Sequence, residues 1–245
     1  MPRESLAADV SALMEELAAV EQEVTASLSD LHAPFIQLVQ GQWQRTFPLV
    51  RAAFVLTAGT MAGGAQPAPR KAGETPDPVR QRIYLAAAME TLRLALSVHT
   101  QLLLAESPGA IDRSLLGSTV LAGDFCFSRS AGLAAKTGSP VIVDLFAGAL
   151  QRVSEGSLRR LFRPADPPYE VDRDLCLSGI AAANELAGLP PAVRDLDQEV
   201  GGQLLDSYRA GTASAGDTPE FALLSSDRRA HWLALAAWLG DHPAA

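Results

Sequence analysis

The sequence lacks an apolar stretch long enough to span a bilayer. A membrane-spanning helix needs about 18 or more apolar residues in a row, and the richest stretch, residues 83–105, contains Glu90, Arg93 and His99. Residues 1–4 lead into a polar amphipathic segment that lacks the apolar centre of a secretion signal. The sequence therefore predicts a cytoplasmic protein with no transmembrane segment.

Cysteine is scarce, and positive charge is not in excess. Cys126 and Cys176 are the only cysteines, and without C-x-x-C spacing they predict buried reduced thiols rather than a zinc site or a redox pair. The 28 acidic residues outnumber the 20 basic ones, which gives a formal net charge of −8. This charge argues against a nucleic-acid partner and disfavours attachment to an anionic membrane by charge alone.

Long β-branched runs are also absent. The clearest short one, Val141-Ile142-Val143, follows Pro140, a residue that commonly occupies the first turn of a helix. Hydrophobic residues make up 48% of the 245-residue chain, and many of them are alanine and leucine, which favour helices. We therefore expect an all-α protein with a sizeable core, in which residues 1–245 form a single domain.

Apolar periodicity predicts where the helices lie. The first helix carries one apolar stripe with 4-3-4-3-4 spacing, which fits an outer helix of a bundle or, alternatively, a dimer seam: Leu6, Val10, Leu13, Leu17, Val20 and Val24. Further helices are expected over residues 35–61, 78–106, 121–135, 141–162, 175–186, 190–209 and 221–239. A flexible loop rich in glycine and proline is expected at about residues 63–77. Consecutive helices joined by modest loops indicate a helical bundle.

Two motifs in this helical frame resemble a known family. His99-Thr100 is followed seven residues later by Glu106-Ser107-Pro108-Gly109-Ala110, and then by Leu121-Ala122-Gly123-Asp124-Phe125. This order is similar to that of the trans-polyprenyl diphosphate synthases, in which a His-Thr helix leads to a D-D-x-x-D motif and later to Leu-Ala-Gly-Asp-Tyr/Phe. The resemblance implies an isoprenoid-synthase-like helical bundle around a central cavity. It also shows one acid, Glu106, where the family has three that bind magnesium.

Spacing argues independently against a metal site at Glu106. Carboxylates at i and i+4 share a helix face and can together bind magnesium. The next acid, Asp112, lies six residues on, which at about 100° per residue places it far around a helix. Pro108-Gly109 also disfavours a continuous helix. We expect no metal and no other cofactor.

The other family landmarks are eroded in the same way. The segment Gln42-Trp43-Gln44-Arg45-Thr46-Phe47-Pro48 is similar to the family's G-G-K-R-L-R-P, yet only Arg45 and Pro48 match. Arg113 is the single arginine where the family has an Arg-Arg-Gly loop, and Asp206 is the single acid in the counterpart of the second aspartate motif. The resemblance therefore leaves five candidate substrate-binding positions and no catalytic residue: Arg45, His99, Glu106, Arg113 and Asp206.

Two residues near these motifs have simpler structural explanations. A lone histidine on a buried helix, such as His99, is usually a packed side chain. Asp124 follows a glycine at an expected helix start, where a carboxylate can cap free amide groups. We therefore expect structural rather than catalytic roles for both residues.

The resemblance implies three functions that the sequence leaves open. The favoured one is a non-catalytic, regulatory or structural subunit of a heteromeric polyprenyl diphosphate synthase, paired with a catalytic subunit in a heterodimer or heterotetramer. The second is a divergent prenyltransferase or lyase with a rearranged metal site at Glu106, Asp112 and Asp206. The third is a homodimer that binds a prenyl chain.

Overall fold

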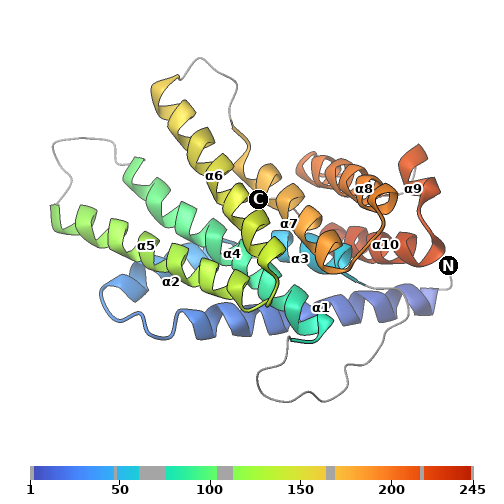
Figure 1. Ribbon diagram of the computed structural model, residues 1–245, viewed down its shortest axis with the longest axis horizontal. Helices are drawn as coiled ribbons and strands as arrows, with labels where there is room; N and C mark the ends of the chain where they lie inside the picture. Colours follow the sequence, from blue (N-terminus) through green and yellow to red (C-terminus); the bar gives the residue numbers. More distant parts are fainter. Residues whose placement is uncertain are drawn as a thin grey trace.

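The computed structural model describes residues 3–46, 49–60, 76–103, 113–163, 169–215 and 218–243. These residues form helices and no strand (Figure 1), which confirms the predicted all-α class. The helices are, in chain order, α1 (Arg3–Ser27), α2 (Phe35–Thr46), α3 (Val50–Ala58), α4 (Pro78–Leu103), α5 (Arg113–Ala135), α6 (Pro140–Phe162), α7 (Val171–Leu186), α8 (Pro191–Arg209), α9 (Pro219–Leu223) and α10 (Ser226–Asp241).

Helix α1 lies along one edge of the bundle, where its apolar stripe packs inward. Leu13, Leu17, Val20 and Val24 are buried, and α1 contacts α3, α4 and α10 (Figure 1). The stripe therefore belongs to an outer helix of the bundle, as its spacing predicts.

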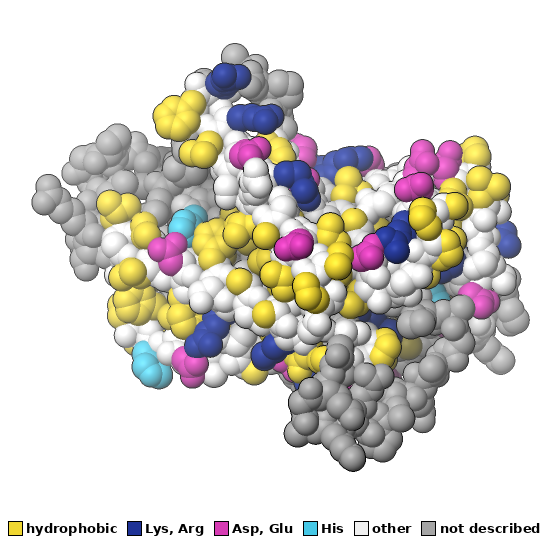
Figure 2. All heavy atoms as spheres, viewed as in Figure 1, with side chains coloured by type: hydrophobic (Ala, Val, Ile, Leu, Met, Phe, Trp, Pro, Cys, Tyr) yellow, Lys and Arg dark blue, Asp and Glu magenta, His cyan; other side chains and the backbone are white. Residues whose placement is uncertain are grey.

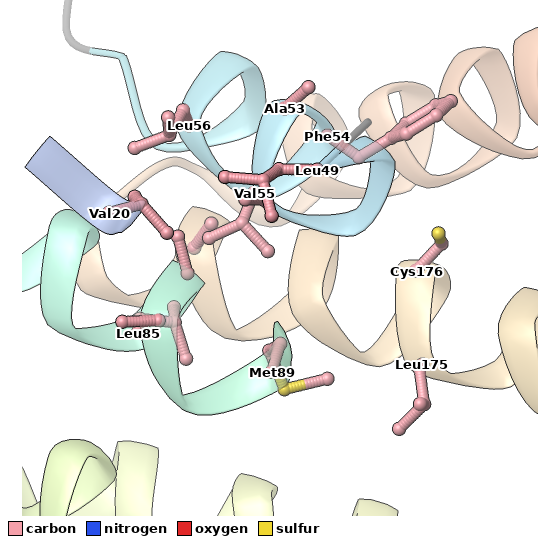
Figure 3. Packing of buried hydrophobic residues seen from close by; sticks show 14 of the residues in the cluster. Val20, Leu49, Ala53, Phe54, Val55, Leu56, Leu85, Met89, Leu175 and Cys176 are labelled. Carbon is pink, nitrogen blue, oxygen red and sulfur yellow. The ribbon is translucent and has the colours of Figure 1, made fainter. Parts of the chain in front are cut away.

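Helix α4 forms the centre of the bundle, in contact with α1, α2, α3, α5 and α7. Every residue from 85 to 92 is buried, because neighbouring helices cover all sides of this part of α4. Figure 3 shows Val55 of α3, Met89 of α4 and Leu175 of α7 in one cluster of packed side chains. The same core continues to Leu239 of α10.

Two expected helices are each divided into two. The helix expected at residues 35–61 is replaced by α2 and α3, and the backbone is non-helical at Leu49, the residue that precedes α3. Pro48 explains the division from sequence, because proline disfavours helical backbone at the residue before it. Residues 221–239 divide between α9 and α10, because Leu224 is extended and the Ser225 side chain caps α10 by accepting from the Arg228 amide.

The start of α5 corrects another expectation. The helix begins at Arg113 rather than at residue 121, so Asp124 lies in its interior and does not cap it. Most of the loop predicted at residues 63–77 lies outside the described residues. Its last residue, Asp77, accepts a hydrogen bond from the Arg80 amide at the start of α4.

Candidate functional site

The end of α4 that precedes residues 104–112 packs closely on α5. His99 lies over Gly123, where a Cβ atom would come within 1.8 Å of the imidazole Cδ2. The His99 ring also meets Phe127 edge-on, with 5.2 Å between ring centroids. Gly123 is therefore needed for the close approach of the two helices and does not mark a helix start.

His99 has an acidic neighbour that the sequence did not reveal. Its Nε2 atom lies 3.5 Å from Oδ1 of Asp124. This contact is too poorly aligned for a hydrogen bond, so the buried Nε2 has no hydrogen-bond partner among the residues that the structure describes. A histidine and one carboxylate can exchange a proton, but the pair supplies only two potential ligands for a metal ion.

Asp206 lies on α8, facing α7. Its carboxylate accepts hydrogen bonds from Arg173, with 3.2 Å between Oδ1 and the guanidinium Nε. The pair lies in an open groove of about 480 Å³ whose lining also includes Asp195 and Glu199. Arg209, the basic residue nearest in sequence, binds Glu170 instead of Asp206.

An ionic cluster connects α3, α4 and α7, with Arg51 and Glu90 buried and Asp172 partly exposed. Arg51 donates from Nε to Glu90 Oε2 at 3.0 Å and from Nη1 to Asp172 Oδ1 at 2.9 Å. Arg93 also binds Asp172, with 2.6 Å between Nε and Oδ1. Glu90 further accepts a hydrogen bond from the Ala52 amide at 2.9 Å. Both carboxylates therefore have cationic or amide partners, as charges in a helical core require.

The charges of this cluster determine the ionisation of Asp172. Burial acts to raise the pKa of the Asp172 carboxyl, but the positive charges of Arg51 and Arg93 outweigh burial and hold the pKa below its usual value. Asp172 also lies in the first turn of α7, where the helix dipole favours a negative charge. Asp172 is therefore ionised at neutral pH and locks the start of α7 to α3 and α4.

Of the five predicted site residues, the structure describes the side chains of two, His99 and Asp206. Glu106 lies outside the described residues, as do the side chains of Arg45 on α2 and Arg113 on α5. His99 and Asp206 are described, and no described contact joins them. Sequence reasoning missed the ionic cluster altogether, although Glu90 within a strongly apolar helix was a signal, because a buried carboxylate needs a partner.

The described residues do not fit a magnesium site. No group of three His, Cys, Asp or Glu side chains within the described ranges is placed to hold a metal ion. Asp206, the one acid of the second motif, is bound by a guanidinium group, whose charge opposes a nearby cation.

No helix within the described parts of the chain is long and apolar enough to cross a membrane.

Solved structures identify the fold. The chain is similar to geranylgeranyl pyrophosphate synthase from Lactobacillus brevis, with 16% sequence identity, a TM-score of 0.62, and coverage of 93% of this chain and 83% of that one. It is also similar to a polyprenyl synthase from Caulobacter crescentus complexed with calcium and isoprenyl diphosphate. There the identity is 19% and the TM-score 0.61, and the match covers 97% of this chain and 86% of that one.

A third structure gives the same result. Geranylgeranyl pyrophosphate synthase from Corynebacterium glutamicum matches at 20% identity and a TM-score of 0.60, over 93% of this chain and 82% of that one. Neither a protein-family model nor a curated protein matches the sequence significantly. The order of helices and the solved structures together show that the chain has the all-α fold of the trans-polyprenyl diphosphate synthases.

Proposed function

We propose that this protein is a non-catalytic, regulatory or structural subunit of a heteromeric polyprenyl diphosphate synthase in the cytoplasm. The observation that carries the proposal is the salt bridge between Asp206 and Arg173. The only acid in the counterpart of the second aspartate motif is bound by Arg173, in a chain that keeps the synthase fold.

Loss of the condensation chemistry follows from the charges. A diphosphate leaving group needs several converging cations, whether metal ions or forked arginines. The sequence has one acid in each motif segment and single arginines, Arg45 and Arg113, where the family has clusters. We therefore propose that the protein binds no magnesium, and we assign no catalytic step to it.

Exposed apolar side chains on α5 and α6 support the proposed pairing. Among the described residues, every exposed large hydrophobic side chain except Met14 and Leu223 belongs to these two helices. Six of these side chains lie near the starts of the two helices: Leu116, Val120 and Leu121 on α5, and Val141, Val143 and Leu145 on α6. Figure 2 shows hydrophobic side chains gathered over the face formed by α5 and α6.

This apolar face suits a permanent partner. Permanent subunit interfaces commonly bury roughly 2,000 Å² or more and are more apolar than ordinary surface. A catalytic synthase subunit covering the face would remove these side chains from water, and the pair would form a heterodimer or heterotetramer. Expressed alone, the protein would form a homodimer through the same face. Pairing would let this subunit adjust the stability or the product length of its partner.

The pairing is tested by co-expression with synthases of the same cell that have an intact D-D-x-x-D motif, followed by native mass measurement. We expect a complex of defined mass, which Leu121→Glu and Leu145→Glu should each dissociate because they place a charge in the apolar face. Met14→Glu, at an exposed position on α1, is the matched control. A stable monomer that binds no synthase would contradict the proposal.

Catalysis is tested separately with the isolated protein. We expect no magnesium-dependent condensation of allylic and isopentenyl diphosphates. The Glu106→Ala, Asp206→Ala double variant distinguishes residual activity of the chain from contaminating host synthase. Product formed by the wild type and lost in the double variant would establish the alternative, a divergent prenyltransferase or lyase.

A further inference from the structure

The last turns of α6 extend beyond the body of the protein. Among the residues of the helix whose side chains are described, Val153 and Gly156 are the last that are buried. At Gly156 the Tyr169 ring lies so close that a Cβ atom would come within 2.2 Å of it. Beyond this contact the helix projects away from the other helices (Figure 1), and residues 158, 159, 162 and 163 are exposed.

This projecting end, residues 158–163, has an unusual composition for an exposed helix end. Phe162 is 79% exposed and Leu158 is 53% exposed, and because they are four residues apart they lie on one side of the helix. The sequence also places three arginines within five residues, Arg159, Arg160 and Arg163. Figure 2 shows basic and hydrophobic side chains together where α6 ends.

Arg159 and Arg163 are not used to stabilise the described part of the fold. The guanidinium groups of Arg159 and Arg163 form no ion pair with any residue that the structure describes. The nearest acid on the helix, Glu155, accepts a hydrogen bond from Gln151 at 2.9 Å. The end of α6 is thus a local positive site on a chain whose net charge is −8.

The shape and positive charge of the projecting end of α6 favour a lipid bilayer over a protein as its binding partner. A narrow convex projection cannot supply the roughly 800 Å² per partner that a stable protein interface needs. A lipid bilayer can accept such a projection, because aromatic and aliphatic side chains enter the headgroup boundary while arginines bind phosphate groups. The acidic remainder of the protein does not prevent this approach, because salt screens charges beyond about 8 Å.

We propose that the end of α6, from Leu158 to Arg163, docks on an anionic lipid bilayer, where Arg159 and Arg163 bind lipid phosphates and Phe162 and Leu158 enter the boundary of the acyl chains. The attachment is peripheral and reversible, since two arginines and two apolar side chains are a small anchor. It does not depend on pairing with a synthase.

Vesicle flotation of the full chain tests the proposal. The wild type should float with vesicles of phosphatidylglycerol and phosphatidylcholine in equal parts, and not with phosphatidylcholine alone. Phe162→Ala should lower the partition coefficient about tenfold. Arg159→Gln combined with Arg163→Gln should lower it by about 25-fold, since each arginine near an anionic surface contributes a factor of about five.

The controls are matched by residue type. Leu223→Ala on α9 removes a hydrophobic side chain that is 71% exposed, and Arg229→Gln removes an arginine of α10. Both variants should float like the wild type. Equal binding to neutral vesicles, or unchanged binding by the α6 variants, would overturn the proposal. So would a change of native mass in the Phe162 variant without a change in flotation, because the projection would then contact protein.

Discussion

At the scale of single residues, the contact between His99 and Gly123 determines how closely α4 and α5 approach. The imidazole occupies the space that a Cβ atom would need at position 123. Any larger residue there must displace the ring from its contact with Phe127. The glycine is therefore a packing requirement of this pair of helices.

We expect Gly123→Ala to destabilise the protein by about 1–3 kcal/mol, the usual cost of overpacking. Gly132→Ala is the matched control on the same helix. Nothing lies within 4 Å of the added Cβ there, so the substitution should be neutral or stabilise by up to about 1 kcal/mol. Urea unfolding measures both variants. Equal stability changes in the two would contradict this explanation of Gly123.

The sequence predicted these residues only in part. The residues Leu121-Ala122-Gly123-Asp124 were correctly assigned to a helix, yet Gly123 and Asp124 were interpreted as its start. A glycine in a sequence can begin a helix or make room for a ring from a neighbouring helix. Which of these roles it has depends on tertiary packing, which the sequence alone does not reveal. Similarly, Arg173 is 33 residues from Asp206 in the chain, and neither local spacing nor periodicity could predict that pair.

At the scale of elements, the cluster around Arg51 holds three helices together. Glu90 is fully buried and binds both the Arg51 side chain and the first turn of α3. Asp172 extends the cluster to α7. Removing one partner would leave a charge in the core without compensation, which costs far more than losing an exposed pair.

Glu90→Ala should therefore lower the free energy of unfolding by about 3–5 kcal/mol. Replacing both partners, in Glu90→Leu with Arg51→Met, should recover much of this loss, because no unpaired charge remains. Asp206→Ala, which breaks the exposed pair with Arg173, should cost about 1 kcal/mol or less. A Glu90→Ala variant as stable as Asp206→Ala would show that the cluster is not energetically important.

Helix positions were more predictable than helix ends. Apolar periodicity together with proline and glycine located α4, α6 and α8 to within a few residues. The breaks at Leu49 and Leu224 were missed, although Pro48 and Ser225, the residues beside them, are signals of a helix boundary.

At the scale of the whole molecule, α10 packs against α1, so the two ends of the described chain are in contact. His231 of α10 lies beside Asp9 and Glu16 of α1, around a small cavity of about 80 Å³. Its Nδ1 atom is buried without a hydrogen-bond partner among the described residues. Burial, reinforced by the charges of Arg228 and Arg82, lowers the pKa of His231, although Asp9 and Asp227 act in the opposite direction.

Stability should consequently fall on mild acidification. Because the folded-state pKa of His231 is below the unfolded value of 6.5, the unfolded chain takes up the proton first as the pH falls. The urea midpoint should drop between about pH 7.5 and 5.5, and drop less in His231→Gln. His32→Gln, at an exposed position, is the control. An identical pH dependence in wild type and His231→Gln would exclude His231 as the cause.

The fold as a whole could be predicted because the landmarks occur in a specific order along the chain. His99-Thr100 and Leu121-Ala122-Gly123-Asp124 identified the synthase-like bundle, and similar solved structures confirm that fold. Residues 85–92 of α4 are buried in the helical core, and a central cavity stays a prediction. The loss of catalysis also stays a prediction.

The contact between α1 and α10 also has a consequence for synthesis on the ribosome. The first helix emerges early, but α10 follows it by nearly the whole chain. At about 5–20 residues per second, this delay is roughly ten seconds or more. During that time Leu13, at the cavity shared with α10, remains uncovered on that side. The nascent chain therefore exposes to chaperones part of the apolar stripe of α1 that the finished protein buries.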